Sequence, residues 1–365
     1  MDKKNVPPIK RILMTADTMG GVWTYALELI KALGEYQIEV NMATMGAPLR
    51  RDQRNEVEDI PHLNIFESRY KLEWMDNPWE DVELAGHWLL SLEEAVQPDL
   101  IHLNGYVHGA LPWKSPALVV GHSCVASWWM AVKGHPMPET WGKYLQEVRC
   151  GLRATPLVIA PTRAMLSILE QHYGPLGKTK VIANGRSPSL FRPDKKNPFI
   201  LSAGRIWDEG KNIMALDRIA PYVPWPVYVA GEGEHPNEKA SPSSHVHLLG
   251  HLSHHHLSSW LANASIYALP ARYEPFGLSA LEAALAGCAL VLGDIPSFRE
   301  IWQDAALYVD PGDQEDLITA IHHLIDDKDF RQTMALKARN RGLVFTPKNM
   351  ARQYLSVYQE LAENK

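Results

Sequence analysis

Short apolar runs alternate along the whole chain with amphipathic stretches of helical spacing. The apolar runs are rich in Val, Ile, Leu and Ala, and they are bounded by Gly, Pro, Asn and Asp, as strands are. This alternation is typical of α/β folds with parallel sheets. Because the strands form two similar series, the pattern predicts an α/β protein with two Rossmann-like domains.

Each domain is expected to contain six strands. Those of the first half are Ile12–Thr15, Glu39–Thr44, Leu100–Leu103, Leu118–Gly121, Leu157–Ala160 and Val181–Ala183. Those of the second half are Ile200–Ala203, Val227–Ala230, Val246–Leu249, Ile266–Leu269, Leu290–Leu292 and Ala306–Val309. A polar stretch with three prolines between Ser187 and Pro198 reads as a linker. We therefore expect domains over residues 1–187 and 188–346, followed by a helix in residues 347–365 that starts near Pro347.

The most informative segment is a predicted helix from Leu278 to Ala286. It is made almost entirely of Leu and Ala, and Gly287 follows where a left-handed cap belongs. The unpaired N–H groups at its start, after Pro275-Phe276-Gly277, suit a phosphate. Glu282 interrupts the apolar run and needs a partner if it is buried.

Two carboxylates, Glu274 and Glu282, flank this helix start and suit hydroxyl groups beside a diphosphate, as in a nucleotide sugar. Their Glu-x7-Glu spacing inside Glu-Pro-Phe-Gly-Leu resembles the signature of the retaining glycosyltransferases of family 4. The alternative is a half-exposed helix residue and an unrelated loop charge. The resemblance is to the bacterial surface-polysaccharide type.

The resemblance implies the GT-B fold, in which two Rossmann-like domains face each other across a cleft. It implies that residues 1–187 lie on the acceptor side and that residues 188–346 bind the nucleotide-sugar donor. The C-terminal helix, residues 347–365, is then expected to cross back and pack on the first domain.

Gly204, Arg205 and Lys211 stand in a loop after the first strand of the second domain. Arg can bind an oxyanion through two hydrogen bonds, and Lys supplies a point charge. They resemble the family's Gly-Arg…Lys element, in which both cations neutralise the leaving diphosphate; surface salt bridging is the alternative. Asn212 stands where the family often has Gly.

Other loops that follow strands complete the expected site, because open α/β sheets bind ligands at their carboxyl edge. Gly20-Gly21 would let the backbone approach a ligand closely, or form only a tight turn. His122 matches the family's first-domain histidine near the transferred sugar, although Ser123 replaces the Asp that often follows. The residues expected to be catalytic are His122, Glu274, Arg205 and Lys211. Those expected to bind the donor are Gly20, Gly21, Asn184, Gly204, Arg205, Lys211, Gly231, Gly250, His251, Leu252, Glu274, Pro275, Phe276, Gly277, Leu278 and Glu282.

No metal and no cofactor are expected. Strand-end loops lack Asp-x-Asp, and His254-His255-His256 has no carboxylate or cysteine to complete a metal site. Arg205, Lys211 and the helix start would then stabilise the developing charge. The family resemblance implies retention of the anomeric configuration, with Glu274 holding the donor sugar, Glu282 the ribose, and a leaving phosphate oxygen as base.

Length and composition fit this reading. The chain of 365 residues, 46% hydrophobic and 21% charged, is ordinary for a two-domain globular protein. Its net charge of −6 argues against nucleic acid as a partner. The three cysteines form no CxxC pair, and no apolar run reaches the roughly 18 residues of a membrane span. We expect a cytoplasmic protein, with peripheral association at the inner face of the membrane left open.

The expected reaction is hexose transfer from a nucleotide sugar to a saccharide or lipid-linked saccharide, in polysaccharide or glycoconjugate biosynthesis. UDP-glucose is the best expectation for the donor; GDP-mannose and ADP-glucose stay open. Tryptophans at 74, 79, 88, 113, 128, 129 and 141 offer rings on which an acceptor could stack. The alternatives are another GT-B enzyme, such as an epimerase, or a nucleotide-sugar binding protein without catalysis.

Overall fold

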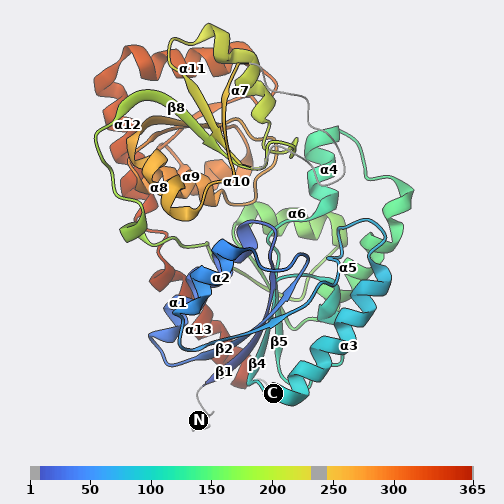
Figure 1. The fold of residues 1–365 in the computed structure, drawn as a ribbon. Helices are drawn as coiled ribbons and strands as arrows, with labels where there is room; N and C mark the ends of the chain where they lie inside the picture. The colour runs from blue at the N-terminus through green and yellow to red at the C-terminus, as the bar shows by residue number, and fades with distance from the viewer. Residues whose placement is uncertain (1–8, 232–244, 364–365) are drawn as a thin grey trace, which may run out of the picture. The chain divides into compact units, whose positions relative to one another are not determined.

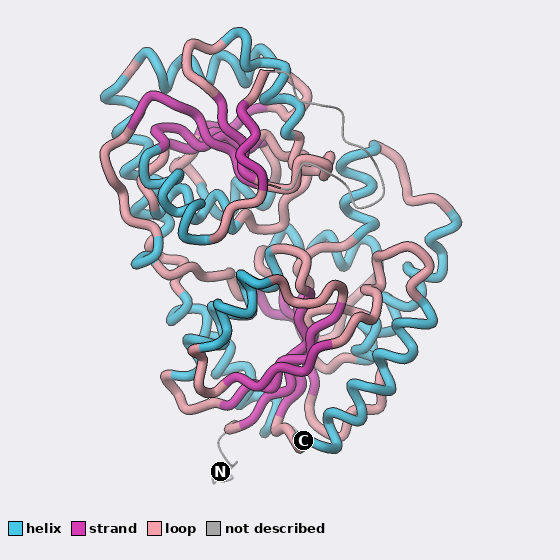
Figure 2. Tube along the Cα trace, viewed as in Figure 1, coloured by secondary structure: helices cyan, strands magenta, loops and turns pink. Residues whose placement is uncertain are grey.

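The structure, a computed structural model, describes residues 9–231 and 245–363. The chain divides into two compact units (Figure 1). Of the described residues, the first unit holds 9–129, 135–185 and 347–363, and the second holds 130–134, 186–231 and 245–346. Each unit is built on one twisted sheet with helices around it, as the magenta strands and cyan helices of Figure 2 show.

The first unit contains a parallel sheet of seven described strands in the order β3-β2-β1-β4-β5-β6-β7. They are β1 (Arg11–Asp17), β2 (Glu39–Met45), β3 (Leu63–Glu67), β4 (Leu100–Leu103), β5 (Ala117–Val120), β6 (Leu157–Ala160) and β7 (Lys178–Val181). The strand order reverses between β1 and β4. The carboxyl ends of these two strands therefore mark the place where a Rossmann-like sheet binds ligands.

Helices cover both faces of this sheet. The helices of the unit are α1 (Gly21–Gly34), α2 (Arg51–Glu58), α3 (Trp79–Val96), η1 (Val107–Ala110), α4 (Val125–Lys133), η2 (Glu139–Trp141), α5 (Gly142–Ala154), α6 (Arg163–Tyr173) and α13 (Pro347–Glu363). The end of α4, from residue 130, belongs to the second unit. Successive β1 residues alternate between two hydrophobic clusters: Ile12 and Met14 pack with α1 and α13, and Leu13 packs with α3, α5 and α6. This period of two is what a strand covered on both faces requires.

The final helix, α13, belongs to the first unit, as the GT-B resemblance predicted. It packs along α1 on one face of the sheet. Met350, Tyr354, Val357 and Tyr358 recur at helical spacing and are buried in the same cluster as α1. The hydrophobic pattern thus predicted both the helix and its buried face.

The second unit contains a parallel sheet of six described strands in the order β10-β9-β8-β11-β12-β13. They are β8 (Asn197–Ala203), β9 (Val227–Ala230), β10 (His247–Gly250), β11 (Ala264–Leu269), β12 (Ala289–Gly293) and β13 (Leu307–Val309). The surrounding helices are η3 (Pro188–Leu190), α7 (Ile213–Ile219), η4 (Ala220–Tyr222), α8 (His254–Asn263), α9 (Leu278–Leu285), α10 (Pro296–Trp302), α11 (Gln314–Asp326) and α12 (Lys328–Gly342). The order reverses between β8 and β11, so the expected binding edge lies where these two strands end.

The predicted fold class is confirmed in its two Rossmann-like parallel sheets and its C-terminal helix. Two strand predictions were wrong. β3 was not predicted, and β7 covers Lys178–Val181 rather than Val181–Ala183. The short helix was predicted almost to the residue: α9 ends at Leu285, and Gly287 has a φ of +80°. In the described residues, no helix is both long and apolar enough to cross a membrane.

Candidate active site

Three glycines bring neighbouring loops together at the carboxyl edge of the second sheet. Gly204 follows β8, Gly231 follows β9, and Gly250 ends β10. The Gly231 N–H donates to the Gly250 carbonyl at 2.9 Å, and a Cβ on Gly231 would lie 1.8 Å from the Gly204 carbonyl oxygen. Because the φ of Gly231 is also +152°, only glycine fits there. The structure therefore places these three predicted donor-binding residues side by side.

The loop after β8 carries the two predicted cations. Lys211 Nζ forms an ion pair with Glu274 Oε2, and the exposed fractions of these side chains are only 18% and 11%. Arg205 Nη2 lies 3.2 Å from Asp208 Oδ2, and its guanidinium carbon lies 4.9 Å from the centre of the Trp207 ring. The Arg205 side chain is 38% exposed. Both cations are thus held by neighbouring carboxylates, and Arg205 remains accessible.

Glu274 also closes the start of α9. Its Oε1 accepts the N–H of Phe276 at 3.4 Å and of Gly277 at 3.0 Å, and the Ser297 hydroxyl donates to its backbone carbonyl. Gly277 has a φ of +90°, and a Cβ there would lie 2.6 Å from the Phe298 ring. The carboxylate that was predicted to hold the donor sugar is therefore fixed beside the helix start that was predicted to face the phosphates.

Four further predicted residues surround these loops. Pro275 and Leu278 are half-buried on either side of the Phe276-Gly277 turn. His251 is exposed and Leu252 is half-buried, directly after β10. Their position after β10 is consistent with the backbone contacts to a nucleotide base that the resemblance implies, and this role stays a prediction.

Asn212 explains one departure from the family pattern. Its backbone is left-handed, with a φ of 55°, which asparagine tolerates better than most residues other than glycine. Its Nδ2 donates to the carbonyls of Pro270 at 2.9 Å and Pro311 at 2.8 Å. Asn212 thus keeps the conformation that glycine would allow and ties the Lys211 loop to two neighbouring segments.

Glu282 is buried in α9 and paired with a residue that the sequence analysis missed. Arg186 Nε lies 2.7 Å from Glu282 Oε1, and the two side chains are 4% and 6% exposed. The Arg186 guanidinium carbon lies 4.9 Å from the centre of the Phe191 ring, and its Nη2 lies 3.5 Å from His254 Nδ1. A buried carboxylate in an apolar helix requires such a partner. The arginine directly after Asn184-Gly185 was the available signal.

The glycine loop of the first unit leads from β1 into α1. Gly20 has a φ of +145°, and a Cβ built on it meets no atom within 4 Å, so its backbone is open to close approach. Gly21 is the first residue of α1. Asp17 Oδ1 accepts the Met19 N–H at 2.6 Å and so orders the turn between them. Asn184, the remaining predicted donor residue, is buried after β7.

His122 lies just after β5 and is half-buried. Its Nε2 is 2.8 Å from Asn104 Oδ1, and its ring centre is 4.5 Å from that of Tyr25 in an edge arrangement. Burial lowers the pKa of His122 to about 3, so the imidazole is neutral near pH 7. Ser123 is exposed and brings no carboxylate. The hydrogen-bond partner of His122 is Asn104, which the sequence did not reveal.

A buried network lies beside His122. His102 in β4 has its Nδ1 2.8 Å from the Tyr358 hydroxyl and its Nε2 3.2 Å from the Tyr25 hydroxyl. Tyr25 donates to the Tyr354 hydroxyl at 2.6 Å. Burial lowers the pKa of His102 to about 3 and raises the pKa of each tyrosine, so the network is neutral at pH 7. It fastens α13 to α1 and β4.

Glu73, in the loop after β3, is another acid that the sequence analysis missed. Its carboxylate accepts the backbone N–H of Tyr106 at 3.2 Å and of Val107 at 3.0 Å, where η1 begins. Burial raises the pKa of Glu73 to about 7. Its partners lie far along the chain, so no local pattern marks it.

The tryptophans that the sequence analysis singled out are all half-buried. Those that pack against the cluster holding Leu13 are Trp74, Trp79, Trp88, Trp113 and Trp141. The other two, Trp128 and Trp129 on α4, have ring centres 6.1 Å apart. A role of these rings in binding an acceptor stays a prediction.

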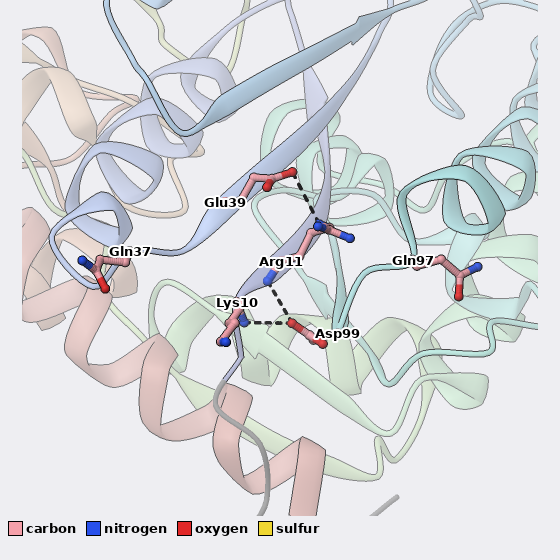
Figure 3. Close-up of a pocket in the computed structure, with 6 residues that line it drawn as sticks. All are labelled: Lys10, Arg11, Gln37, Glu39, Gln97 and Asp99. Atoms are coloured by element: carbon pink, nitrogen blue, oxygen red, sulfur yellow. Dashed lines mark hydrogen bonds and ion pairs between the residues drawn. The ribbon is translucent and has the colours of Figure 1, made fainter.

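A pocket at the opposite, amino-terminal edge of the first sheet is shown in Figure 3. It is lined by Lys10, Arg11, Gln37, Glu39, Gln97 and Asp99. Asp99 accepts the backbone N–H groups of Lys10 and Arg11, and the Arg11 side chain lies 3.5 Å from Glu39, so both acids of the pocket already have partners within the chain. Across residues 9–231 and 245–363, no group of three or more His, Cys, Asp or Glu side chains could hold a metal ion.

Solved structures share this fold over nearly the whole chain. The chain is similar to sucrose-phosphate synthase from Thermosynechococcus elongatus, with a TM-score of 0.84, 19% identity, and coverage of 98% of this chain and 100% of that one. It is also similar to Anabaena HepE in complex with UDP-glucose, with a TM-score of 0.76, 19% identity, and coverage of 96% and 99%. Identities this low show a shared fold, which is the GT-B class.

Two family models adjoin along the sequence. "Glycosyltransferase Family 4" matches residues 19–190, and "Glycosyl transferases group 1" matches residues 188–341. The chain therefore belongs to glycosyltransferase family 4, a retaining family whose enzymes depend on nucleotide sugars.

Curated relatives agree with this assignment and differ among themselves. The D-inositol 3-phosphate glycosyltransferase of Nocardioides sp. is 25% identical over 97% of this chain and 90% of that protein. The glycogen synthase of Mycobacterium tuberculosis is 32% identical over 52% of this chain and 50% of that protein. Their names indicate unrelated acceptors, so family membership leaves the substrates of this chain open.

Proposed function

We propose that this protein transfers a hexose from a UDP-sugar, with UDP-glucose as the best candidate, to a saccharide or lipid-linked saccharide acceptor. The anomeric configuration is retained and no metal ion takes part. The acceptor is a precursor of a polysaccharide or glycoconjugate, of the surface-polysaccharide type that the sequence resembles.

The observation that carries this proposal is the Lys211–Glu274 ion pair at the start of α9. A bound diphosphate would compete for Lys211, and Arg205 in the same loop would bind a second phosphate oxygen. Glu274 would then be released to accept hydrogen bonds from hydroxyls of the donor sugar. One exchange of partners within the second unit would thus bind both the diphosphate and the sugar of the donor.

Glu282 fits the ribose. Arg186 engages its Oε1, and the carboxylate keeps acceptor positions for the ribose hydroxyls. Gly231, Gly250, His251 and Leu252 would seat the base through their backbone. In a front-face reaction, a leaving phosphate oxygen would take the proton of the incoming hydroxyl, while Lys211 and Arg205 stabilise the diphosphate.

The first unit would supply the acceptor side. Gly20 and Gly21 offer open backbone near the end of β1, and His122 would contact the transferred sugar. The UDP-glucose complex of Anabaena HepE, which has the same fold, supports a UDP-sugar donor. The half-buried tryptophans support a saccharide acceptor, since aromatic rings give a sugar an apolar face to pack on.

A donor panel in EDTA tests the proposal. UDP-glucose, UDP-galactose, UDP-N-acetylglucosamine, GDP-mannose and ADP-glucose are compared by thermal stabilisation and by slow hydrolysis. A donor at about 100 times its dissociation constant should add about 2.7 kcal/mol to the free energy of unfolding. We expect UDP-glucose to stabilise the protein and to be hydrolysed without metal.

Two arginine variants distinguish binding at the proposed donor site from an unspecific loss of stability. Arg205→Ala should weaken stabilisation by UDP, whereas Arg218→Ala, at an exposed position on α7, should not. No stabilisation by any donor, or equal stabilisation in Arg205→Ala and the unchanged protein, would contradict the proposed donor site. Conversion of UDP-glucose to an isomer without an acceptor would indicate the alternative epimerase.

A further inference from the structure

His122, one of the residues predicted to be catalytic, lies between the Asn104 side chain and the Tyr25 ring. Its ring can carry a proton on either nitrogen, and the two forms present opposite chemistry to a ligand. Which form exists depends on the partner of Nε2, the Asn104 side chain 2.8 Å away. The orientation of the Asn104 amide therefore decides what His122 can bind.

Thr15 fixes that orientation. Asn104 Nδ2 donates to the Thr15 backbone carbonyl at 2.7 Å, and the Asn104 N–H donates to Thr15 Oγ1 at 2.8 Å. Thr15 is buried inside β1, so this anchor is rigid. Reversing the amide would set two oxygens against each other at Thr15, because a carbonyl can only accept. Asn104 Oδ1 must therefore face His122, and Nε2 must carry the hydrogen.

The other ring nitrogen, Nδ1, is then an acceptor. The described hydrogen bond of His122 is made by Nε2, and the side chain is only half-buried, so Nδ1 is left for a ligand. Tyr25 from α1 packs against the ring, and His102 from β4 lies beside it; both are buried and neutral. No cation from these elements competes for Nδ1.

We propose that Asn104 is a positioning residue that holds His122 in its Nε2–H form, so that Nδ1 accepts a hydrogen bond from a sugar hydroxyl. A neutral acceptor repels phosphate oxygens, so His122 contacts the hexose or the acceptor sugar and not the diphosphate. This inference rests on the proposed transferase function for its ligand. The protonation state itself does not depend on that function.

Histidine ¹⁵N NMR tests the inference directly. The protein is labelled with ¹⁵N-histidine, and long-range ¹H–¹⁵N spectra distinguish the two neutral forms and the imidazolium. His122→Gln assigns the His122 signals by their loss. We expect Nε2 protonated and Nδ1 unprotonated from pH 6 to 8. A protonated Nδ1 in the unchanged protein would overturn the inference.

Two variants at the same position sharpen the test. Asn104→Leu should convert His122 to a mixture of both neutral forms. Asn104→Asp keeps an oxygen that can accept the Nε2–H and adds a negative charge, so it should raise the pKa of His122, while its second oxygen loses the bond to the Thr15 carbonyl. Asn41→Leu, at another buried asparagine of the same sheet, is the control and should leave the His122 signals unchanged.

Activity supplies a second readout. Asn104→Leu should lower kcat about tenfold with little change in KM for the nucleotide sugar, as expected when one oriented hydrogen bond is weakened. If Asn104→Leu does not fold, the NMR titration of Asn104→Asp tests the inference instead. An unchanged pKa of His122 in that variant would overturn the inference. If the NMR signature holds and no donor is turned over, the proposed function fails and the role of Asn104 stands.

Discussion

Lys211 and Glu274, at the carboxyl edge of the second sheet, form an ion pair, whereas His122 and Asn104, at the same edge of the first sheet, form a neutral hydrogen-bonded pair. Both sheets have a Rossmann-like strand order and end in glycine-bearing loops. The difference lies in how polar groups are satisfied. The Lys211–Glu274 pair balances charge against charge, whereas burial keeps His122 and the neighbouring His102 network uncharged.

This contrast has energetic consequences. Removing one member of a buried ion pair leaves a charge without compensation, which costs far more than a lost hydrogen bond. A charged edge can exchange its internal partner for a charged ligand. A neutral edge is instead sensitive to acid, because protonation introduces a charge that nothing balances. The effects of substitutions on stability should therefore differ between the two units in magnitude and in pH dependence.

The largest effect is expected at the buried pair of the second unit. Arg186→Leu leaves Glu282 buried without its partner and should lower the free energy of unfolding by about 3–5 kcal/mol. Urea unfolding at pH 7.5 measures the loss. The double variant Arg186→Leu/Glu282→Leu should recover most of it, because no buried charge remains. A loss below about 1 kcal/mol in the single variant would mean that water reaches Glu282.

Next is the carboxylate that we propose to hold the donor sugar. Glu274→Gln should lower kcat by about a hundred- to a thousandfold. Binding of UDP should be unchanged or tighter, since Lys211 loses its internal competitor. Initial rates and calorimetric titration with UDP separate the two effects. Glu315→Gln, at the exposed start of α11, is the control. Equal losses in kcat and UDP affinity would argue against contact with the sugar.

The neutral network of the first unit should respond to acid. The folded-state pKa of His102 is about 3, below its ordinary 6.5, so the unfolded chain binds a proton first as the pH falls. The contribution of His102 to stability is complete above about pH 6.5 and is lost toward pH 3, by about 2 kcal/mol at pH 5. His102→Gln should shrink the difference in urea stability between pH 7.5 and 5.0 by that amount. An undiminished difference would place the acid sensitivity elsewhere.

The smallest effect is expected at Asn212, where the backbone is left-handed. Asn212→Ala loses two hydrogen bonds and places Ala in a strained conformation, whereas Asn212→Gly loses the bonds without strain. The alanine variant should therefore be about 1 kcal/mol less stable than the glycine variant. Thermal unfolding of both variants measures the difference. Equal stability would show that the backbone relaxes around Ala.

The sequence predicted the elements whose residues carry strong local patterns. The Leu and Ala run of α9 and the helical spacing of Met350, Tyr354 and Val357 in α13 both specify helices with a buried face. β3 was missed because its edge position leaves Leu63–Glu67 only partly buried, so the apolar pattern is weak. β7 was misplaced for the same reason, since Lys178–Val181 has no buried residue and includes two lysines.

The paired groups of the site were less predictable. A charge in the middle of α9 requires a partner, but nothing local indicates that the partner of Glu282 is Arg186, which lies far away in sequence. The same holds for Asn104, whose amide is oriented by Thr15 on another strand. Pairings of this kind arise only when the sheet has formed, and they decide protonation and charge at the site.

The first unit is discontinuous in sequence, because α13 follows the whole of the second unit. During synthesis, β1 to β7 emerge from the ribosome well before Tyr354 and Tyr358. Until then His102 lacks the Tyr358 hydroxyl, and α1 alone covers its face of the sheet. The second unit can meanwhile complete its own core. The nascent first unit is thus exposed to chaperones and proteases until α13 arrives, and loss of that helix should affect cellular abundance before it affects chemistry.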